Sequence, residues 1–304
     1  MASSVPVLSE QDVASILTYA QLIPLMRETL IAFSAGSILQ PVRQMLVVEE
    51  QERYLGIMPA VTPDAMGAKL VCFYPKNAQF DRHTHLASIA LFDPEFGTPL
   101  AFLDGRLITE MRTAATSAAV TQVLAAPQSR SLALIGSGVQ AKAHLYALRE
   151  IFPIEDVRVW SQTASNAERF AETHGARAMS AADAVDGADI VVCATSARTP
   201  VLQGAWLKPG AHVNSVGSPR PDWRELDDAV MAETVIVDSY EAAQKEAGDV
   251  ILSGASIFAE AGEVLGGRKQ VDRAATTIFK SVGIACEDLA AARLVFNLHK
   301  RAVR

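Results

Sequence analysis

The chain has 304 residues, half of them hydrophobic, and its 27 basic and 34 acidic side chains give a net charge of −7. A chain of this length supports about two domains with a substantial core, and its acidic balance argues against nucleic acid as a partner. The cysteines at positions 72, 193 and 286 show no metal-ligand spacing, so we expect free thiols and no metal. Because no apolar run is long enough to cross a membrane and no export signal is visible, we expect a cytoplasmic protein without a membrane partner.

The first hundred residues predict helices followed by a sheet. Residues 9–35 carry apolar side chains at helical spacing, and we expect two helices divided near Pro24. From Arg43 the period shortens, and strands are expected over residues 45–48, 54–58, 68–73 and 87–92. Proline, glycine, aspartate and asparagine separate these runs, which favours an open antiparallel or mixed sheet.

The pattern changes at Arg112, which we expect to open a helix of small residues over 113–126. Strands then alternate with helical segments, at residues 132–135, 157–160, 190–194, 212–216 and 235–237. This alternation is typical of a doubly wound parallel Rossmann sheet. A last helix over 283–301 has an apolar face that we expect to return to the first domain. We therefore predict an α/β protein with a Rossmann domain at 113–280, a smaller α+β domain at 1–112 and 281–304, and the site in the cleft.

A dinucleotide fingerprint follows the first strand of the second half. The apolar run 131–135 ends in Gly136-x-Gly138-x-x-Ala141 and continues as a helical pattern. Glycines allow a tight turn and let backbone N–H groups approach a pyrophosphate, and the helix N-terminus favours anions. The context of strand, turn and helix predicts a dinucleotide site here.

The end of the second strand bears on the choice of nucleotide. NAD-binding chains usually carry a carboxylate there, for the ribose hydroxyls, whereas this strand ends at Trp160 and is followed by Ser161, Gln162 and Thr163. No negative charge would repel a ribose phosphate, so NADP(H) is preferred over NAD(H). A plain polar turn would be compatible with either cofactor.

Three cations interrupt apolar or small-residue contexts. They are Arg43, which begins a strand, Lys69 within a strand, and Arg112. If they converge, they would hold a carboxylate; the alternative is that each is a surface charge. His83 and His85 could share a strand face, but no cysteine or carboxylate follows at a useful spacing, so we prefer a buried or cofactor-facing histidine to a zinc site.

Taken together, the motifs resemble those of the ornithine cyclodeaminase/mu-crystallin family over nearly the full length. The resemblance is carried by short motifs along the whole chain, namely Pro41-Val-Arg43, Gly67-Ala-Lys69, Thr109-x-x-Arg112, Gly136-Ser-Gly-Val-Gln-Ala141, Lys208-Pro-Gly-Ala-His-Val-Asn214, the run 218–228, Glu246-Ala-Gly-Asp249 and Phe279-Lys-Ser281. The last three of these motifs, which begin at Ser218, Glu246 and Phe279, resemble the mu-crystallin branch more closely than the cyclodeaminases.

The resemblance implies a homodimer formed through the sheet domain and a nicotinamide cofactor on the Rossmann domain. It implies that Arg43, Lys69 and Arg112 surround the carboxylate of a small imino or amino acid, with Lys69 and Arg112 also catalytic. Besides Gly136 and Gly138 of the fingerprint, it assigns cofactor contacts to Thr84, His85, Arg112, Val139, Gln140, Ser161, Gln162, Thr163, Thr195, Val216 and Ser281. Relatives with NADP carry an arginine where Gln162 stands, which leaves the cofactor preference open.

Two departures from the cyclodeaminases bear on the reaction. Their catalytic aspartate would fall at Pro219, and a glutamate before their Met-Pro pair is missing, since Gly56 and Ile57 precede Met58. The resemblance therefore favours an NAD(P)H-dependent ketimine reductase acting on pyrroline- or piperideine-2-carboxylate, with Lys69 as candidate proton donor. The alternatives are an ornithine cyclodeaminase, an alanine dehydrogenase and an NADP-dependent small-molecule binding protein.

Overall fold

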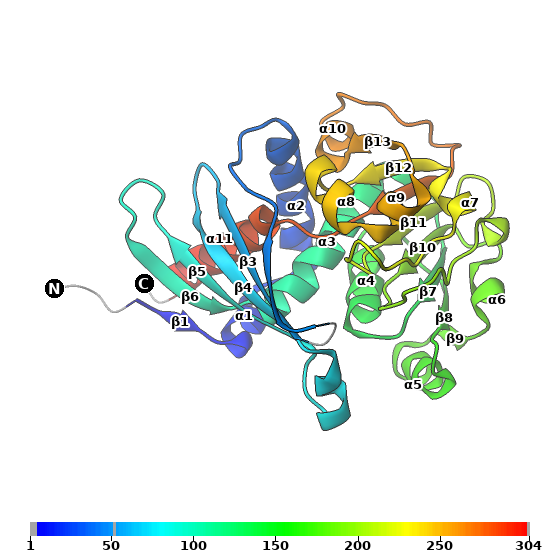
Figure 1. Ribbon diagram of the computed structural model, residues 1–304, viewed down its shortest axis with the longest axis horizontal. Coiled ribbons are helices and arrows are strands. Elements are labelled where there is room, and N and C mark those ends of the chain that lie inside the picture. Colours follow the sequence, from blue (N-terminus) through cyan, green and yellow to red (C-terminus); the bar gives the residue numbers. More distant parts are fainter. Residues whose placement is uncertain (1–4, 51–52, 303–304) are drawn as a thin grey trace. The chain divides into compact units, whose positions relative to one another are not determined.

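The computed structural model describes residues 5–50 and 53–302 (Figure 1). The chain divides into two compact units, Met1–Arg112 with Ile284–Arg304, and Thr113–Gly283. The boundaries expected from the sequence were residues 112 and 281. Residues 1–4, 51–52 and 303–304, which the expected α+β domain includes, lie outside the described residues.

The first unit contains a six-stranded sheet in the order β1-β6-β5-β4-β3-β2. All neighbours are antiparallel except β1 and β6, which run parallel, so the expected antiparallel or mixed sheet is confirmed. The two neighbouring strands at one edge of this sheet, β1 and β6, were not predicted from the sequence. The bounds are β1 (Val7–Leu8), β2 (Gln44–Glu49), β3 (Arg53–Val61), β4 (Met66–Phe73), β5 (His85–Phe92) and β6 (Pro99–Asp104), with the 3₁₀ helix η1 (Pro75–Phe80) between β4 and β5.

Helices cover one face of this sheet. Helix α11 (Ala285–Ala302) packs across β3, β4 and β5 and against α2 (Tyr19–Ser34), and α1 (Glu10–Ile16) precedes α2. The expected division near Pro24 is wrong, because Pro24 lies inside α2 and the break falls at Thr18. Thr18 and Gln21 form a capping box that starts the new helix, which is a stronger signal than a proline in the second turn.

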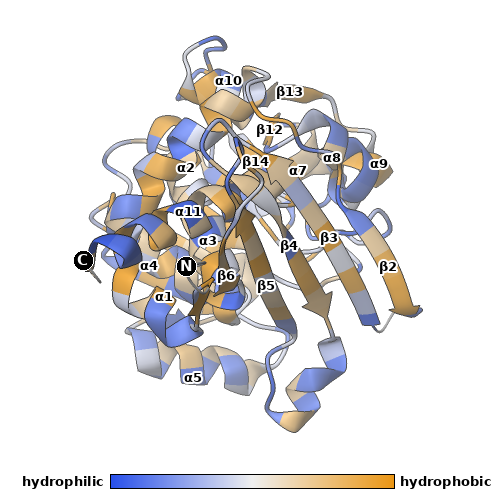
Figure 2. Ribbon diagram, turned by 90° about the vertical axis from the view of Figure 1, so that its left-hand side faces the viewer, coloured by the Kyte–Doolittle hydropathy of each residue, from blue (hydrophilic) through white to orange (hydrophobic). Residues whose placement is uncertain are grey.

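Strand register assigns side chains to the two faces of the sheet. Lys69 on β4 is paired with Met58 on β3 and Ile89 on β5, and these two neighbours are buried. Since side chains alternate along a strand, Lys69 points to the face covered by α11, whereas Leu70 points to the other face. Figure 2 shows that much of β2 to β6 is hydrophobic.

The second unit contains an eight-stranded sheet in the order β13-β12-β14-β11-β10-β7-β8-β9, and all its strand pairs are parallel. The chain direction across the sheet reverses between β7 and β10, as in a doubly wound fold, so the predicted Rossmann sheet is confirmed. The bounds are β7 (Ser131–Ile135), β8 (Asp156–Trp160), β9 (Arg177–Ala178), β10 (Ile190–Cys193), β11 (His212–Ser215), β12 (Thr234–Val237), β13 (Ile257–Glu260) and β14 (Thr277–Lys280). Strands β9, β13 and β14 were missed in the sequence analysis.

The helices of this unit alternate with its strands. They are α4 (Val139–Arg149), α5 (Ala164–His174), α6 (Ala181–Val185), the 3₁₀ helix η2 (Gly204–Trp206), α7 (Asp228–Met231), α8 (Tyr240–Glu246), α9 (Gly248–Ser253) and α10 (Ala261–Leu265). No helix among the described residues is sufficiently long and apolar to span a membrane.

Helix α3 (Arg106–Leu124) corrects the expectation that Arg112 opens a helix. The helix begins six residues earlier, where the Asp104 carboxylate accepts hydrogen bonds from the backbone N–H groups of Arg106 and Leu107. The helical spacing before Arg112 was obscured by the short strand β6 immediately upstream. Arg112 therefore lies within the helix, where its backbone is fully hydrogen-bonded and its side chain has a defined direction.

Candidate active site

A buried group of charges lies between β4, α3 and α11. Lys69 is only 2% exposed, and its Nζ lies 2.6 Å from Oδ2 of Asp288. Lys69 Nζ also donates to Oγ1 of Thr109 at 3.4 Å, and the Thr109 hydroxyl in turn donates to the carbonyl oxygen of Gly105. The lysine therefore has one strong and one weak partner in the protein.

Arg112 binds the two adjacent carboxylates at the start of α11. Its Nε donates to Oδ1 of Asp288 at 2.9 Å, and its Nη1 donates to Oε2 of Glu287. Both carboxylates are fully buried, and Arg112 is 4% exposed. We refer to Lys69, Arg112, Glu287 and Asp288 as the charge cluster. Its two cations balance its two anions, which is what a buried set of charges requires.

Burial and neighbouring charges set the protonation of the cluster. Burial lowers the pKa of Lys69 to about 8; Asp288 opposes this decrease, and the positive charges of Arg112 and Arg43 add to it. Burial raises the pKa of Asp288, but Arg112 and Lys69 outweigh it and hold the pKa below its ordinary value. Near neutral pH Lys69 is thus charged but gives up its proton far more easily than an exposed lysine.

Three residues were predicted to bind a substrate carboxylate. Two of them, Lys69 and Arg112, share the partner Asp288, and the third, Arg43, lies nearby. Arg43 immediately precedes β2, close enough for its charge to lower the pKa of Lys69. Arg112 differs from the expectation, because two of its three guanidinium nitrogens already donate to Asp288 and Glu287. Part of the Arg112 guanidinium is thus engaged within the protein, and its other N–H groups remain for an external carboxylate.

His85 lies on the same face of the sheet as Lys69. It begins β5, pairs with Phe73 in register, and its ring lies 4.5 Å from the Phe73 ring. His85 is exposed by its surface area, yet desolvation by the surrounding protein and the Lys69 charge lower its pKa to about 4, so it is neutral at neutral pH. His83 lies before the strand, and Thr84 Oγ1 is 3.2 Å from His85 Nδ1. In the described part of the chain no three histidine, cysteine or carboxylate side chains form a metal site, and the three cysteines are free thiols.

The fingerprint adopts the predicted strand, turn and helix. Gly136 ends β7 with φ of +118°, and a Cβ there would lie 2.5 Å from the carbonyl oxygen of Ala194, so only glycine fits. Gly138 caps α4 and has open space where a side chain would project. The buried Oε1 of Gln140 has no hydrogen-bond partner in the described chain. The open helix N-terminus at Gly138 fits a bound pyrophosphate, whereas the Gln140 oxygen is an acceptor and would face a donor of the ligand instead.

The remaining predicted cofactor residues of this unit lie at the carboxyl ends of its parallel strands, where open α/β sheets bind nucleotides. Ser161, Gln162 and Thr163 follow β8, and the hydroxyls of Ser161 and Thr163 make no hydrogen bond to any residue that the structure describes. Thr195 follows β10, Val216 follows β11 and Ser281 follows β14. Thus, all of these positions share one edge of the sheet.

A second set of buried charges lies at this edge and was missed in the sequence analysis. Glu225 accepts hydrogen bonds from the backbone and hydroxyl of Thr195, from Ser215 Oγ and from the N–H of Gly217. Lys280 Nζ pairs with Oδ2 of Asp249 at 2.7 Å and donates to Ser215 Oγ and to the carbonyl oxygen of Gly217. These bonds fix the loops after β10 and β11.

The sequence contained an indication of both groups of residues that were missed, because each group includes a charged residue within an apolar segment. Glu287 and Asp288 interrupt the small and apolar run 284–292, and Lys280 ends the apolar strand β14. Arg112 was selected on the same criterion. A charge in an apolar segment needs a buried partner, but sequence does not show which partner it finds.

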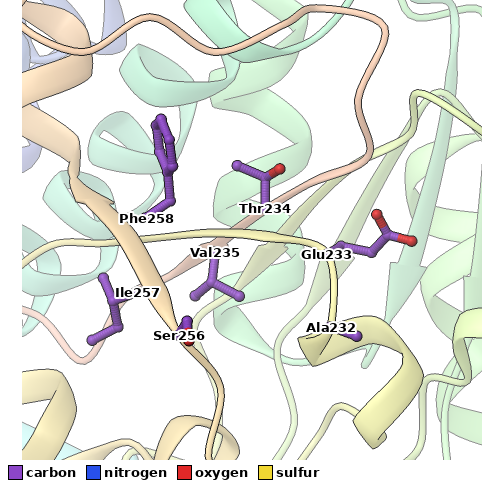
Figure 3. Close-up of a pocket in the computed structure, with 7 residues that line it drawn as sticks. All are labelled: Ala232, Glu233, Thr234, Val235, Ser256, Ile257 and Phe258. Carbon is purple, nitrogen blue, oxygen red and sulfur yellow. The ribbon is translucent and has the colours of Figure 1, made fainter.

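One open depression of about 500 Å³ lies elsewhere on the second unit (Figure 3). It is lined by residues 232–235, at the start of β12, and 256–258, at the start of β13. These are the amino ends of the parallel strands, at the sheet edge opposite to the fingerprint. We therefore do not assign the cofactor to this depression.

The chain is similar to known proteins in sequence and in fold. The profile of the ornithine cyclodeaminase/mu-crystallin family matches residues 4–302. The chain is 48% identical over 285 residues to ketimine reductase mu-crystallin of Mus musculus, covering 91% of each chain. It is similar to the structure of Thermococcus litoralis Δ1-pyrroline-2-carboxylate reductase in complex with NADH and L-proline, with a TM-score of 0.94, 34% identity and 98% coverage of each chain. It is also similar to an archaeal alanine dehydrogenase dimer with bound NAD, with a TM-score of 0.93 and 28% identity, covering 99% of this chain and 97% of that one. The chain belongs to the ornithine cyclodeaminase/mu-crystallin family.

Proposed function

We propose that the protein is a ketimine reductase that uses NAD(P)H to reduce the C=N bond of a small cyclic imino acid, such as pyrroline- or piperideine-2-carboxylate. The observation that carries this proposal is the buried Lys69 ammonium, with a pKa of about 8 and cationic Arg43 nearby. Reduction of an imino acid needs a proton for the imine nitrogen and a group that holds the substrate carboxylate in place. Lys69 can supply the proton, and Arg43 can bind the carboxylate. The similarity to imine reductases supports the same reaction.

The residues of the site have separate tasks in this reaction. Arg43 binds the substrate carboxylate, and Lys69 donates a proton to the imine nitrogen, which makes the adjacent carbon a better hydride acceptor. NAD(P)H supplies the hydride when bound, held at the turn after β7. The product is a secondary amine, and the neutral Lys69 regains its proton from solvent. Arg112 donates one N–H of Nε to Asp288 and one N–H of Nη1 to Glu287, so its other N–H groups can take part in binding the carboxylate.

The second unit supports NADP(H) as the preferred cofactor. The loop after β8 carries no carboxylate, and the hydroxyls of Ser161 and Thr163 are available to donate to a ribose phosphate. Gln162 is exposed and adds a neutral donor. A carboxylate at this strand end would instead favour NAD(H).

The cyclodeaminase alternative is disfavoured at both departures. A Cβ on Gly56 would already lie 2.9 Å from a methyl carbon of Val71, so a glutamate at this position would not fit without rearrangement. The nearest carboxylate after Pro219 is Asp222, which lies three residues later and is exposed, and Asp228 is exposed and pairs with Arg224. Cyclodeamination must handle a side-chain amine as well as a hydride, and the chain offers no carboxylate at either matching position.

A homodimer formed through the sheet of the first unit is supported by the outer face of that sheet. Register places Leu55, Ile57, Leu70, Leu86 and Phe102 on this face, opposite to Lys69. Leu70, Leu86 and Phe102 are each 46% exposed. A contiguous apolar face on a sheet is typical of a surface that another subunit covers.

Nicotinamide absorbance in matched assays tests the function. One set contains pyrroline- or piperideine-2-carboxylate with NADPH or NADH, and the other contains ornithine or alanine with NAD and ammonia detection. Oxidation of NADPH by the imines, with ornithine and alanine inert, is the expected result. Ammonia from ornithine without net NADH would identify a cyclodeaminase, and net NADH from alanine would identify an alanine dehydrogenase. If every substrate is inert and an aromatic carboxylate binds tightly, the protein is a carrier.

A further inference from the structure

We propose that Asp288 is the positioning residue that directs the Lys69 ammonium towards the substrate and keeps it protonated. This inference rests on the proposed reductase function, in which Lys69 supplies the imine proton. It gives a role to a carboxylate that the sequence analysis did not single out.

Both oxygens of Asp288 are held in place. Oδ2 faces Lys69 Nζ at 2.6 Å, and Oδ1 accepts from Arg112 Nε at 2.9 Å. Arg112 is itself fixed by Glu287, the preceding residue on α11. The carboxylate thus cannot rotate away from the lysine without breaking a buried ion pair, which is strongly unfavourable.

These contacts leave one N–H of Lys69 for a ligand. An ammonium has three donors; one faces Asp288 and one faces Thr109, and no other residue in the described chain accepts from Lys69. Because β4 fixes the start of the side chain and Asp288 fixes its end, the third N–H has a defined direction. A movable lysine thereby becomes an oriented proton donor.

The charges around Lys69 make Asp288 decisive for its protonation. Arg112 on α3 and Arg43 before β2 repel the ammonium, and burial between the sheet and α11 disfavours it further. His85 on β5 is neutral, and the negative charge of Glu287 is engaged by Arg112. Asp288 is thus the carboxylate in direct contact with Lys69. Without its charge, the pKa of Lys69 would fall below about 8.

Glu287 provides a matched control, since it lies next to Asp288, is equally buried and carries the same charge. It binds Arg112 instead of Lys69. Asp288→Asn and Glu287→Gln therefore remove the same charge from the same helix turn, and only the first removes the partner of Lys69.

The experiment measures kcat/KM for the imine between about pH 6 and pH 9.5 with saturating cofactor. In the wild type the activity falls as pH rises through the pKa of Lys69, at about 8. In Asp288→Asn this decrease should move to lower pH by about one unit or more, because an uncompensated buried ammonium loses its proton sooner. Glu287→Gln should move it by less than half as much.

A second measurement reads Lys69 without any substrate. Lysine labelled with ¹³C at Cε is followed by NMR across the same pH range, with Lys69→Met identifying the signal. A downward shift in Asp288→Asn that exceeds the shift in Glu287→Gln supports the role of Asp288. Equal shifts in the two variants, or none, would overturn it. If the NMR shift occurs but no imine is reduced, the proposed function fails while the Asp288–Lys69 pairing stands.

Asp288→Glu keeps the inference testable if Asp288→Asn does not fold. The longer carboxylate retains the charge but displaces Lys69, so kcat should fall about tenfold while the pH profile stays in place. An unchanged kcat would contradict a positioning role, and a profile displaced to lower pH would contradict the electrostatic part.

Discussion

Lys69 is a charged side chain that is buried within the first unit and paired with a buried carboxylate. It is surrounded by buried neighbours in the middle of a sheet, and yet it is charged. Lys69→Met should lower kcat for imine reduction on the order of 10²-fold, because the imine nitrogen loses its proton donor. Stopped-flow or steady-state oxidation of NADPH measures this effect, and cofactor binding followed by fluorescence is the control. Unchanged kcat at saturating substrate would remove Lys69 from this role.

Arg43 offers a test of carboxylate binding that is separate from proton transfer. Arg43→Lys keeps the charge but loses the planar pair of donors, so the KM for the imine should rise about tenfold with kcat little changed. The Kd of the cofactor should stay at its wild-type value. An effect on kcat alone would instead assign Arg43 to the chemical step.

The sequence predicted buried charged residues where a charge interrupts an apolar pattern. It did not identify the residues with which these charges pair. Lys69 and Arg112 were selected from such interruptions, and both are buried in one cluster. Their partners Glu287 and Asp288 lie 175 and 176 residues after Arg112 in the chain, and further still from Lys69. Pairing across that separation depends on how α11 packs on the sheet, which local spacing does not encode.

At the scale of elements, the glycines of the turn between β7 and α4 have different tasks. Gly136→Ala should destabilise the protein by about 1–3 kcal/mol, because it forces a side chain into a positive φ and against the Ala194 carbonyl. Gly138→Ala should fold normally, since φ there is −85° and nothing lies within 4 Å of the new methyl group.

The same methyl group at Gly138 would project into the space assigned to the pyrophosphate, so the Kd of NADPH should rise about tenfold or more. Thermal unfolding and fluorescence titration of the two variants separate these effects. A Gly138→Ala variant that binds NADPH as tightly as the wild type would argue against the fingerprint as the cofactor site.

Element boundaries were predicted less well than element types, and the reasons are local. A proline suggested a helix end at Pro24, but the capping box at Thr18 determines where α2 begins. Likewise, the start of α3 is set by the Asp104 carboxylate, six residues before the expected position. In both cases side-chain capping decided the boundary, and helical periodicity alone did not reveal it.

At the scale of the whole molecule, the alternation of strands and helices after Arg112 predicted the parallel sheet correctly. The mixed sheet was also predicted, because period-two patterns with turn residues between them have few other arrangements. Strands β13 and β14 were missed, although β10, β11 and β12, which have the same length of four residues, were predicted. The doubly wound order nevertheless identified the edge of the sheet that carries Gly138, Thr195 and Ser281.

Assembly is the property of the whole molecule that the outer sheet face predicts. Leu86 lies on this face near the start of β5, opposite Cys72 in register, and is 46% exposed in the single chain. Leu86→Glu would place a charge in the contact between two subunits, where an unpaired buried charge is strongly unfavourable. We expect the wild type to sediment as a dimer and Leu86→Glu to sediment as a monomer at micromolar concentration.

Phe96→Glu is the matched control for this experiment. Phe96 is 75% exposed in the turn between β5 and β6, so the same charge there should leave the dimer intact. Sedimentation velocity over a range of concentrations distinguishes the three proteins. A monomeric wild type, or dissociation by Phe96→Glu and not by Leu86→Glu, would contradict pairing through the outer face. If Leu86→Glu is monomeric and retains imine reduction, the site is complete within one subunit, because Lys69 and the charge cluster lie on the opposite face of the same sheet.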